Sequence, residues 1–149
     1  MVIGLKHGGV TALAETLLDA AGGLSPAADI DVICPIPMPS LRRRQRGGNQ
    51  AEQLAREASK RTGLPLDPTL LRRRAWRAPR QAQARSHAER RALIRGAFRA
   101  APERVDSRAI LLIDDVTTSL ATLEEAARTL RLAGARAVDA WTAARAELQ

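Results

Sequence analysis

Apolar residues recur along the chain with two different periods, and each period predicts a different kind of element. Apolar positions spaced three and four residues apart are typical of one helix face. They predict helices at residues 11–21, 49–62, 87–95 and 123–132. Short apolar runs, richest in β-branched residues at 30–36, predict strands. They lie at residues 30–36, 109–113 and 137–142, and we expect residues 70–76 to form a further strand or a hairpin arm. Strands that alternate with helices indicate an α/β fold with a mainly parallel sheet.

Several residues mark the ends of the predicted helices. Asn49 stands where it can cap the second helix, and Gly63 ends it. Thr122 and Glu125 have the spacing of a capping box before the last helix, and Gly134 follows that helix. These signals predict helix boundaries near each of the five residues.

The chain has 149 residues, of which 45% are hydrophobic, so we expect one folded domain over residues 1–149. Cys34 is the one cysteine, which excludes a disulfide within the chain and a zinc site built from several thiolates. No apolar run reaches the roughly 18 residues that a membrane span requires, and residues 1–10 lack the core of a signal peptide. The sequence therefore predicts a soluble, cytoplasmic protein.

Positive charge is concentrated in the middle of the chain. The formal net charge is +8, yet residues 41–99 hold 17 of the 24 Lys and Arg and only 4 of the 16 Asp and Glu. Two interpretations stay open, a solvated arginine-rich face or a partner that carries phosphate groups. Aromatic residues make up 2% of the chain, which disfavours binding of a single strand by base stacking.

Acidic and hydroxyl residues follow the predicted strand at 109–113 directly. Asp114 and Asp115 come first. The rest of the run is Val116, Thr117, Thr118, Ser119, Leu120, Ala121 and Thr122. Hydroxyls and free backbone N–H groups at a helix N-terminus form an anion site, and adjacent carboxylates can accept hydrogen bonds from sugar hydroxyls or hold Mg²⁺. The run therefore predicts a pocket for a phosphorylated sugar at the carboxyl edge of the sheet.

An acidic pair after an apolar strand also occurs in two unrelated classes of protein, and the sequence disfavours both. A Walker-B strand would require a phosphate loop of the pattern G-x-x-x-x-G-K-[ST], which this sequence does not contain. A receiver domain would have most of its fold after the acidic pair, whereas only 34 residues follow Asp115. A third alternative stays open, in which Thr122 simply caps a helix and the aspartates form a solvated turn.

The Asp114 run resembles the phosphoribosyl-pyrophosphate motif of the type I phosphoribosyltransferases, and the chain as a whole resembles their ComF family. The resemblance rests on motifs spread over nearly the whole sequence. They are Leu5-Lys6-His7-Gly8-Gly9, Cys34-Pro35-Ile36-Pro37-Met38, Arg46-Gly47-Gly48-Asn49-Gln50-Ala51-Glu52, Arg80-Gln81-Ala82-Gln83, Glu89-Arg90-Arg91, Gly96-Ala97-Phe98, the Asp114 run and Ala133-Gly134-Ala135.

The resemblance implies a shortened Rossmann-like sheet covered by an arginine-rich hood at roughly residues 40–99. Asp114 and Asp115 would be the catalytic pair and would hold Mg²⁺, while residues 116–122 would bind the 5-phosphate of phosphoribosyl pyrophosphate or a related sugar phosphate. The pyrophosphate loop and the hood would contribute Pro35, Ile36, Pro37, Arg46, Asn49, Gln81 and Gln83. In enzymes of this fold, cations and Mg²⁺ stabilise the pyrophosphate as it leaves the sugar.

Three functions remain open within this resemblance. The first is a phosphoribosyltransferase, for which the sequence identifies no acceptor. The second is an accessory protein of natural transformation that binds single-stranded DNA beside other competence proteins. The third is a scaffold that has lost turnover.

The sequence departs from the family pattern in a few places. Leu120 stands where the family has glycine, and a positive φ there would cost a leucine roughly 1–2 kcal/mol. Ser119 replaces a threonine but keeps the hydroxyl, and Leu93 replaces a frequent asparagine. The family usually begins with a cysteine-rich, zinc-binding segment, so we expect either a short member or a truncated start at Met1.

Overall fold

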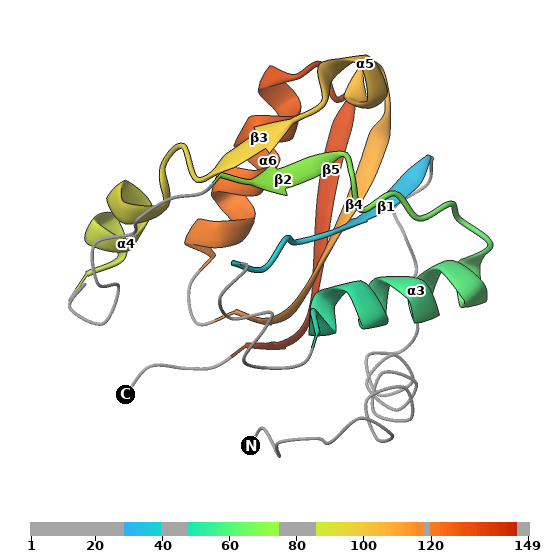
Figure 1. Ribbon diagram of the computed structural model, residues 1–149, viewed down its shortest axis with the longest axis horizontal. Coiled ribbons are helices and arrows are strands. Elements are labelled where there is room, and N and C mark those ends of the chain that lie inside the picture. Colours follow the sequence, from blue (N-terminus) through green and yellow to red (C-terminus); the bar gives the residue numbers. More distant parts are fainter. Residues whose placement is uncertain (1–28, 40–47, 75–85, 118–119, 146–149) are drawn as a thin grey trace.

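The core of the structure is a parallel β-sheet. The computed structural model describes residues 29–39, 48–74, 86–117 and 120–145 (Figure 1). In these segments three strands form a parallel sheet in the order β1-β4-β5. They are β1 (Val32–Pro35), β4 (Ala109–Thr117) and β5 (Ala137–Arg145). The α/β fold with a parallel sheet, predicted from the alternation of strands and helices, is confirmed.

The continuous apolar run of β4 is explained by the position of this strand in the middle of the sheet. Ile110 and Leu112 point into one hydrophobic cluster, whereas Leu111 and Ile113 point into another on the opposite face of the sheet. All four side chains are almost completely buried. A parallel strand covered on both faces has no solvent side, so it reads as an unbroken apolar segment.

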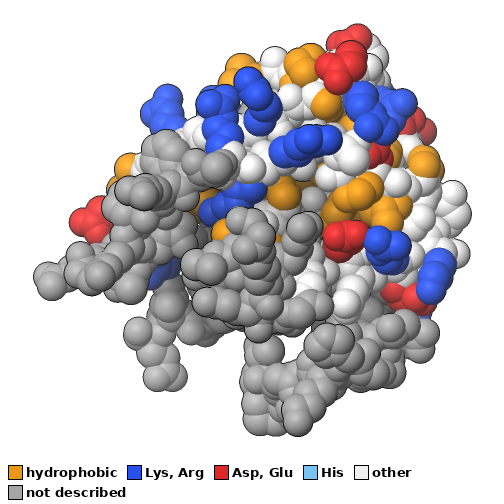
Figure 2. All heavy atoms as spheres, in the orientation of Figure 1, with side chains coloured by type: hydrophobic (Ala, Val, Ile, Leu, Met, Phe, Trp, Pro, Cys, Tyr) orange, Lys and Arg blue, Asp and Glu red, His pale blue; other side chains and the backbone are white. Residues whose placement is uncertain are grey.

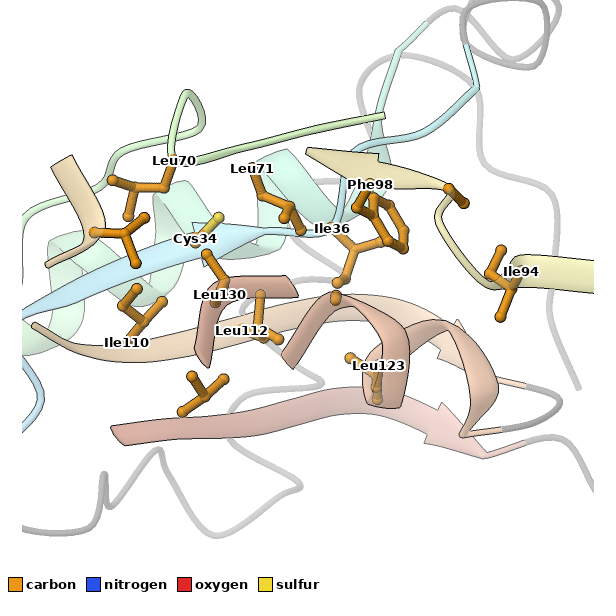
Figure 3. Close-up of a cluster of buried hydrophobic side chains, with 14 of the residues drawn as sticks. Cys34, Ile36, Leu70, Leu71, Ile94, Phe98, Ile110, Leu112, Leu123 and Leu130 are labelled. Carbon is orange, nitrogen blue, oxygen red and sulfur yellow. The ribbon is translucent and has the colours of Figure 1, made fainter. Parts of the chain in front are cut away.

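Each face of the sheet is covered by different elements. Helix α3 (Gln50–Thr62) covers one face through Leu54, Ala55 and Ala58. The other face is covered by α6 (Ala121–Leu132), together with a separate two-stranded antiparallel ribbon. Figure 3 shows this second cluster, with Leu123 and Leu130 of α6 facing the sheet.

The ribbon and two further helices complete the described fold. The ribbon pairs β2 (Leu71–Arg73) with β3 (Phe98–Ala100). Between them in the sequence lies α4 (His87–Ile94), and after β3 comes the short helix α5 (Pro102–Val105). The ribbon packs its inner side on the core through Leu71 and Phe98. It therefore sits above the sheet on the same side as α6 (Figure 1).

The structure corrects two of the predicted helix caps. Asn49 occupies the N-cap position of α3, but its side chain does not cap the helix. Helix α6 begins at Ala121 rather than after Thr122, and Leu120 is its N-cap residue, so the capping box of Thr122 and Glu125 is wrong. A capping box of this kind does occur at Ser86 and Glu89, where it starts α4.

Other predicted boundaries need smaller changes. Gly63 ends α3 in a left-handed conformation, as predicted. Strand β4 continues through Thr117, so Asp114 and Asp115 belong to the strand rather than to the loop after it. The predicted helix at 11–21 falls outside the described residues. The extent of the hood, roughly 40–99, stays a prediction.

Two consecutive glutamates of α6 attach this helix to the α4–β3 segment. Glu125 is buried and accepts hydrogen bonds from the backbone N–H of Gly96 at 2.8 Å and from Arg128 at 2.7 and 2.8 Å. Glu124 is exposed and forms a bidentate ion pair with Arg91 at 2.6 and 2.7 Å. The buried bond replaces water at Gly96, whereas the exposed pair competes with water.

Replacing Glu125 by alanine should therefore lower the free energy of unfolding by about 1–3 kcal/mol, because the Gly96 N–H loses its acceptor. Glu124→Ala, one residue away on the same helix, is the matched control and should have a clearly smaller effect. Urea denaturation measures both values. Equal losses for the two variants would contradict this assignment.

Candidate functional site

Two segments that are far apart in the sequence meet at the carboxyl edge of the sheet. In the β1–β4 register Pro35 lies opposite Ile113, and the Ile36 N–H donates to the Ile113 carbonyl at 2.8 Å. The loop Pro35-Ile36-Pro37 is thus held beside Asp114, the residue after Ile113. Ligands of open parallel sheets bind at this edge. These predicted site residues therefore lie side by side.

Asn49 belongs to the same edge. Its Nδ2 atom donates to the carbonyl of Ile36 at 3.1 Å, which explains why the side chain does not cap α3. This bond fastens the start of α3 to the loop that follows β1. Next to it, Oε1 of Gln50 is buried and meets no hydrogen-bond donor in the described part of the chain. Gln50 was not predicted as a site residue, although it belongs to the Arg-Gly-x-Asn-Gln motif.

The acidic pair has an unusual electrostatic environment. Asp114 is buried, and its Oδ1 atom accepts the backbone N–H of Asp115 at 3.0 Å. Burial first, and then the charge of Asp115, raise the pKa of Asp114 to about 7, while the nearby Arg73 acts in the opposite direction. A carboxyl group with such a pKa changes its charge near neutral pH. Perturbed acids of this kind cluster at functional sites.

The predicted phosphate loop is described only in part. The backbones of Val116 and Thr117 continue β4, with Thr117 opposite Arg145 of β5. Thr118 and Ser119 lie outside the described residues. Ala121 and Thr122 form the first turn of α6, so the helix N-terminus directly follows the acidic strand.

The backbone at Leu120 corrects one expectation. Its φ is −65°, in the right-handed helical region, so the cost expected for a positive φ does not arise. The side chain is 45% exposed at the start of α6. At this position leucine therefore differs from glycine in the bulk of its side chain and not in backbone strain.

Three of the predicted site residues cannot be placed at this edge. Arg46, Gln81 and Gln83 all fall outside the described residues. The ribbon instead brings in a cation that was not predicted, Arg73 of β2. Its neighbours in sequence are also arginines, so only the alternation of faces along the strand distinguishes it.

The side-chain oxygens at the carboxyl edge can be compared with the ligands that Mg²⁺ prefers. Asp114 and Asp115 offer carboxylate oxygens, which Mg²⁺ prefers, and Mg²⁺ commonly uses one or two carboxylates together with waters and substrate phosphates. Across the described segments no three His, Cys, Asp or Glu side chains gather into a metal-binding group. The pair thus fits Mg²⁺ bound jointly with a phosphorylated ligand. Within the same segments, no helix is long and apolar enough to cross a membrane.

The fold is similar to that of known enzymes. It aligns over 92% of this chain with glutamine phosphoribosylpyrophosphate amidotransferase from B. subtilis, at a TM-score of 0.57 and 20% identity. A second structure, the allosteric regulatory enzyme of purine biosynthesis, gives a TM-score of 0.57 and 21% identity. Each alignment covers 26% of the larger chain. The chain therefore has an α/β fold similar to part of these phosphoribosylpyrophosphate-related enzymes.

A comparison of sequences identifies a relative of this chain. Competence protein F from Haemophilus influenzae is 31% identical over 119 residues, which cover 78% of this chain. No family model matches the sequence. The resemblance to the ComF family found in the motifs of this chain is confirmed by this relative. The alignment spans about half the length (51%) of Competence protein F.

The raised pKa of Asp114 predicts a pH dependence of stability. The folded protein holds this proton more tightly than the unfolded chain, whose pKa is near 3.8. Stability from this group is therefore fully present below pH 4 and is lost as the pH rises through 7. Relative to Asp114→Asn, the parent should lose roughly 2–4 kcal/mol of unfolding free energy between pH 4 and pH 8.

Urea denaturation at a series of pH values measures this difference, and a constant gap between parent and variant would refute it. Asp31→Asn is a control of opposite sign. The Ala109 backbone N–H donates to Asp31 at 2.7 Å and lowers the pKa of that carboxyl. The stability contributed by Asp31 is present above pH 4 and is lost as the pH falls through its lowered pKa.

Proposed function

We propose that this protein binds phosphoribosyl pyrophosphate or a closely related sugar phosphate at the carboxyl edge of its sheet. The observation that carries the proposal is the meeting of the Pro35–Pro37 loop with Asp114, joined by the 2.8 Å bond from Ile36 to Ile113. An acidic pair, a second loop and a helix N-terminus at one edge suit a ligand with a sugar between two phosphate groups.

Each part of the edge has a distinct role in this proposal. The N–H groups at the start of α6 bind the 5-phosphate, because they lack partners within the helix and the helix dipole favours an anion there. Asp114 and Asp115 accept hydrogen bonds from the ribose hydroxyls. The Pro35–Pro37 loop, fastened by Asn49, faces the pyrophosphate.

In this proposal Mg²⁺ would bind together with the phosphorylated ligand. When present, it neutralises charge on the pyrophosphate and stabilises that group as a leaving group. Asp114 and Asp115 would hold it through their carboxylate oxygens. A bound cation also favours the charged form of Asp114, which burial disfavours in the ligand-free protein.

The proposal extends to a reaction and to a biological setting. Attack by an acceptor on the anomeric carbon would form the new glycosidic bond and release pyrophosphate. We place this activity in the handling of DNA during natural transformation, because the curated relative is a competence protein. Release of pyrophosphate, with and without candidate acceptors, separates turnover from binding alone.

Isothermal titration of the full chain with phosphoribosyl pyrophosphate and Mg²⁺ tests the binding proposal. Asp114→Asn combined with Asp115→Asn should weaken binding by roughly tenfold or more, because charged hydrogen bonds of about 1.5–3 kcal/mol each are lost. Urea denaturation of the double variant at the same pH separates lost binding from a lost fold.

A matched control removes two exposed acidic charges elsewhere, through Glu103→Gln combined with Asp139→Asn, and should leave the affinity unchanged. Leu120→Gly removes the exposed leucine side chain at the start of α6 and should increase the affinity, because less bulk would stand beside the phosphate. Absence of binding at millimolar ligand by both the parent and Leu120→Gly would refute the proposal.

A second function, binding of single-stranded DNA, is favoured by the outer side of the ribbon. Arg72 and Arg99 are directly opposite each other in the register of β2 and β3, and both are exposed. Arg74 follows on the same side, and none of the three forms an ion pair within the described segments. Figure 2 shows basic side chains over this part of the surface. Like charges placed opposite each other are unfavourable unless anions lie nearby.

Fluorescence anisotropy with an oligothymidine tests this second function. Contact with about six phosphates should make the affinity fall on the order of 10³-fold between 50 and 200 mM salt. Arg72→Met with Arg99→Met should reduce the slope of log affinity against log salt by about 2. Arg56→Met with Arg131→Met removes the same charge elsewhere and is the control. Salt-insensitive binding, or equal effects of the two double variants, would argue against DNA binding through the ribbon.

A further inference from the structure

Arg73 differs from the arginines around it in where its side chain lies. On β2 the side chains of Arg72 and Arg74 are exposed, whereas that of Arg73 is only partly exposed. Arg73 is opposite Phe98 in the ribbon register, and its guanidinium carbon lies 5.2 Å from the centre of the Phe98 ring. Stacking on an aromatic face holds the planar group in one orientation. Arg73 is thus preorganised on the inner side of the ribbon.

The same side chain lies close to the carboxyl edge of the sheet. Phe98 belongs to the buried cluster that includes Ile36, and Figure 3 shows the two side chains next to each other. The positive charge of Arg73 also acts on Asp114. The ribbon therefore brings one ordered guanidinium to the place where the Pro35–Pro37 loop and the acidic pair meet.

The charge balance at this edge requires such a cation. Asp114 and Asp115 add negative charge where a pyrophosphate, itself strongly anionic, would have to bind. Mg²⁺ can offset part of this repulsion, but an ordered guanidinium adds directional donors that match two phosphate oxygens at once. Arginine is the side chain suited to this task, because lysine provides only a point charge.

We infer that Arg73, held on the ring of Phe98, binds the pyrophosphate group and makes the site discriminate between phosphoribosyl pyrophosphate and ribose 5-phosphate. This inference rests on the proposed function and assigns to one residue the recognition of one part of the ligand. The start of α6 binds the 5-phosphate that both ligands share. Arg73 binds the group that only one of them carries.

Isothermal titration of the full chain with each of the two ligands, both with Mg²⁺, tests this assignment. Arg73→Met keeps the apolar stem but removes the guanidinium. It should weaken binding of phosphoribosyl pyrophosphate about 10- to 100-fold, as expected for loss of a charged hydrogen bond. Binding of ribose 5-phosphate should change less than about twofold, because that ligand lacks the group Arg73 recognises. Arg56→Met, which removes an exposed guanidinium from α3, is the matched control and should leave both affinities unchanged.

Three results would overturn the assignment. If Arg73→Met weakens the binding of both ligands equally, Arg73 contributes only to the stability of the fold or to the overall positive electrostatic potential. If Arg56→Met has the same effect as Arg73→Met, the loss of any positive charge on the protein is enough to weaken binding. Should Arg73→Met fail to fold, Arg73→Lys keeps the charge without the planar donors, and an unchanged affinity for phosphoribosyl pyrophosphate would then refute the role.

Failure of the assignment is distinguishable from failure of the proposed function. Suppose that the parent binds phosphoribosyl pyrophosphate, that the Asp114 and Asp115 double variant does not, and that Arg73→Met binds like the parent. The proposed site is then supported, and the role of Arg73 is refuted. If the parent binds neither ligand, both are refuted.

Discussion

Parallel pairing of β1 with β4 is the constraint on which the site depends. Val32 to Pro35 align with Ile110 to Ile113, and the ladder is extended by one bond from Ile36 to the Ile113 carbonyl. Because the strands are parallel, the chain leaves both of them at the same edge. The loop after β1 and the acids of β4, far apart in sequence, therefore meet through the backbone pairing of their strands. The burial of β1 and β4 makes this pairing rigid.

The same edge carries an electrostatic conflict. Two adjacent carboxylates, one of them buried, repel each other at this edge, and the N-terminus of α6, which favours anions, follows them in the chain. In the ligand-free protein the conflict is eased by the raised pKa of Asp114 and by the charge of Arg73. A ligand with sugar hydroxyls, phosphates and an accompanying cation satisfies all three groups at once. Binding of the proposed ligand would therefore relieve the repulsion between the two carboxylates.

Much of this arrangement is predictable from the sequence, and the exceptions have physical causes. The run at 109–113 predicts a buried strand because both of its faces are apolar. The cap at Thr122 was misassigned because local spacing alone does not show that the buried Glu125 is used by Gly96, a residue 29 positions away. Arg73 is one of three consecutive arginines, and only its pairing with Phe98 in the folded ribbon separates it from the others. Local patterns predict elements, whereas long-range partners decide which side chains reach the site.

The fold is supported by its similarity to solved structures, and the central claim concerns what the carboxyl edge binds. A crystal structure of the protein with phosphoribosyl pyrophosphate and Mg²⁺ tests that claim most directly. We expect density for the ribose beside Asp114 and Asp115, with the 5-phosphate at the start of α6 and the pyrophosphate between Ile36 and the ribbon. An edge filled by the Leu120 side chain, or ligand density elsewhere on the molecule, would contradict the account.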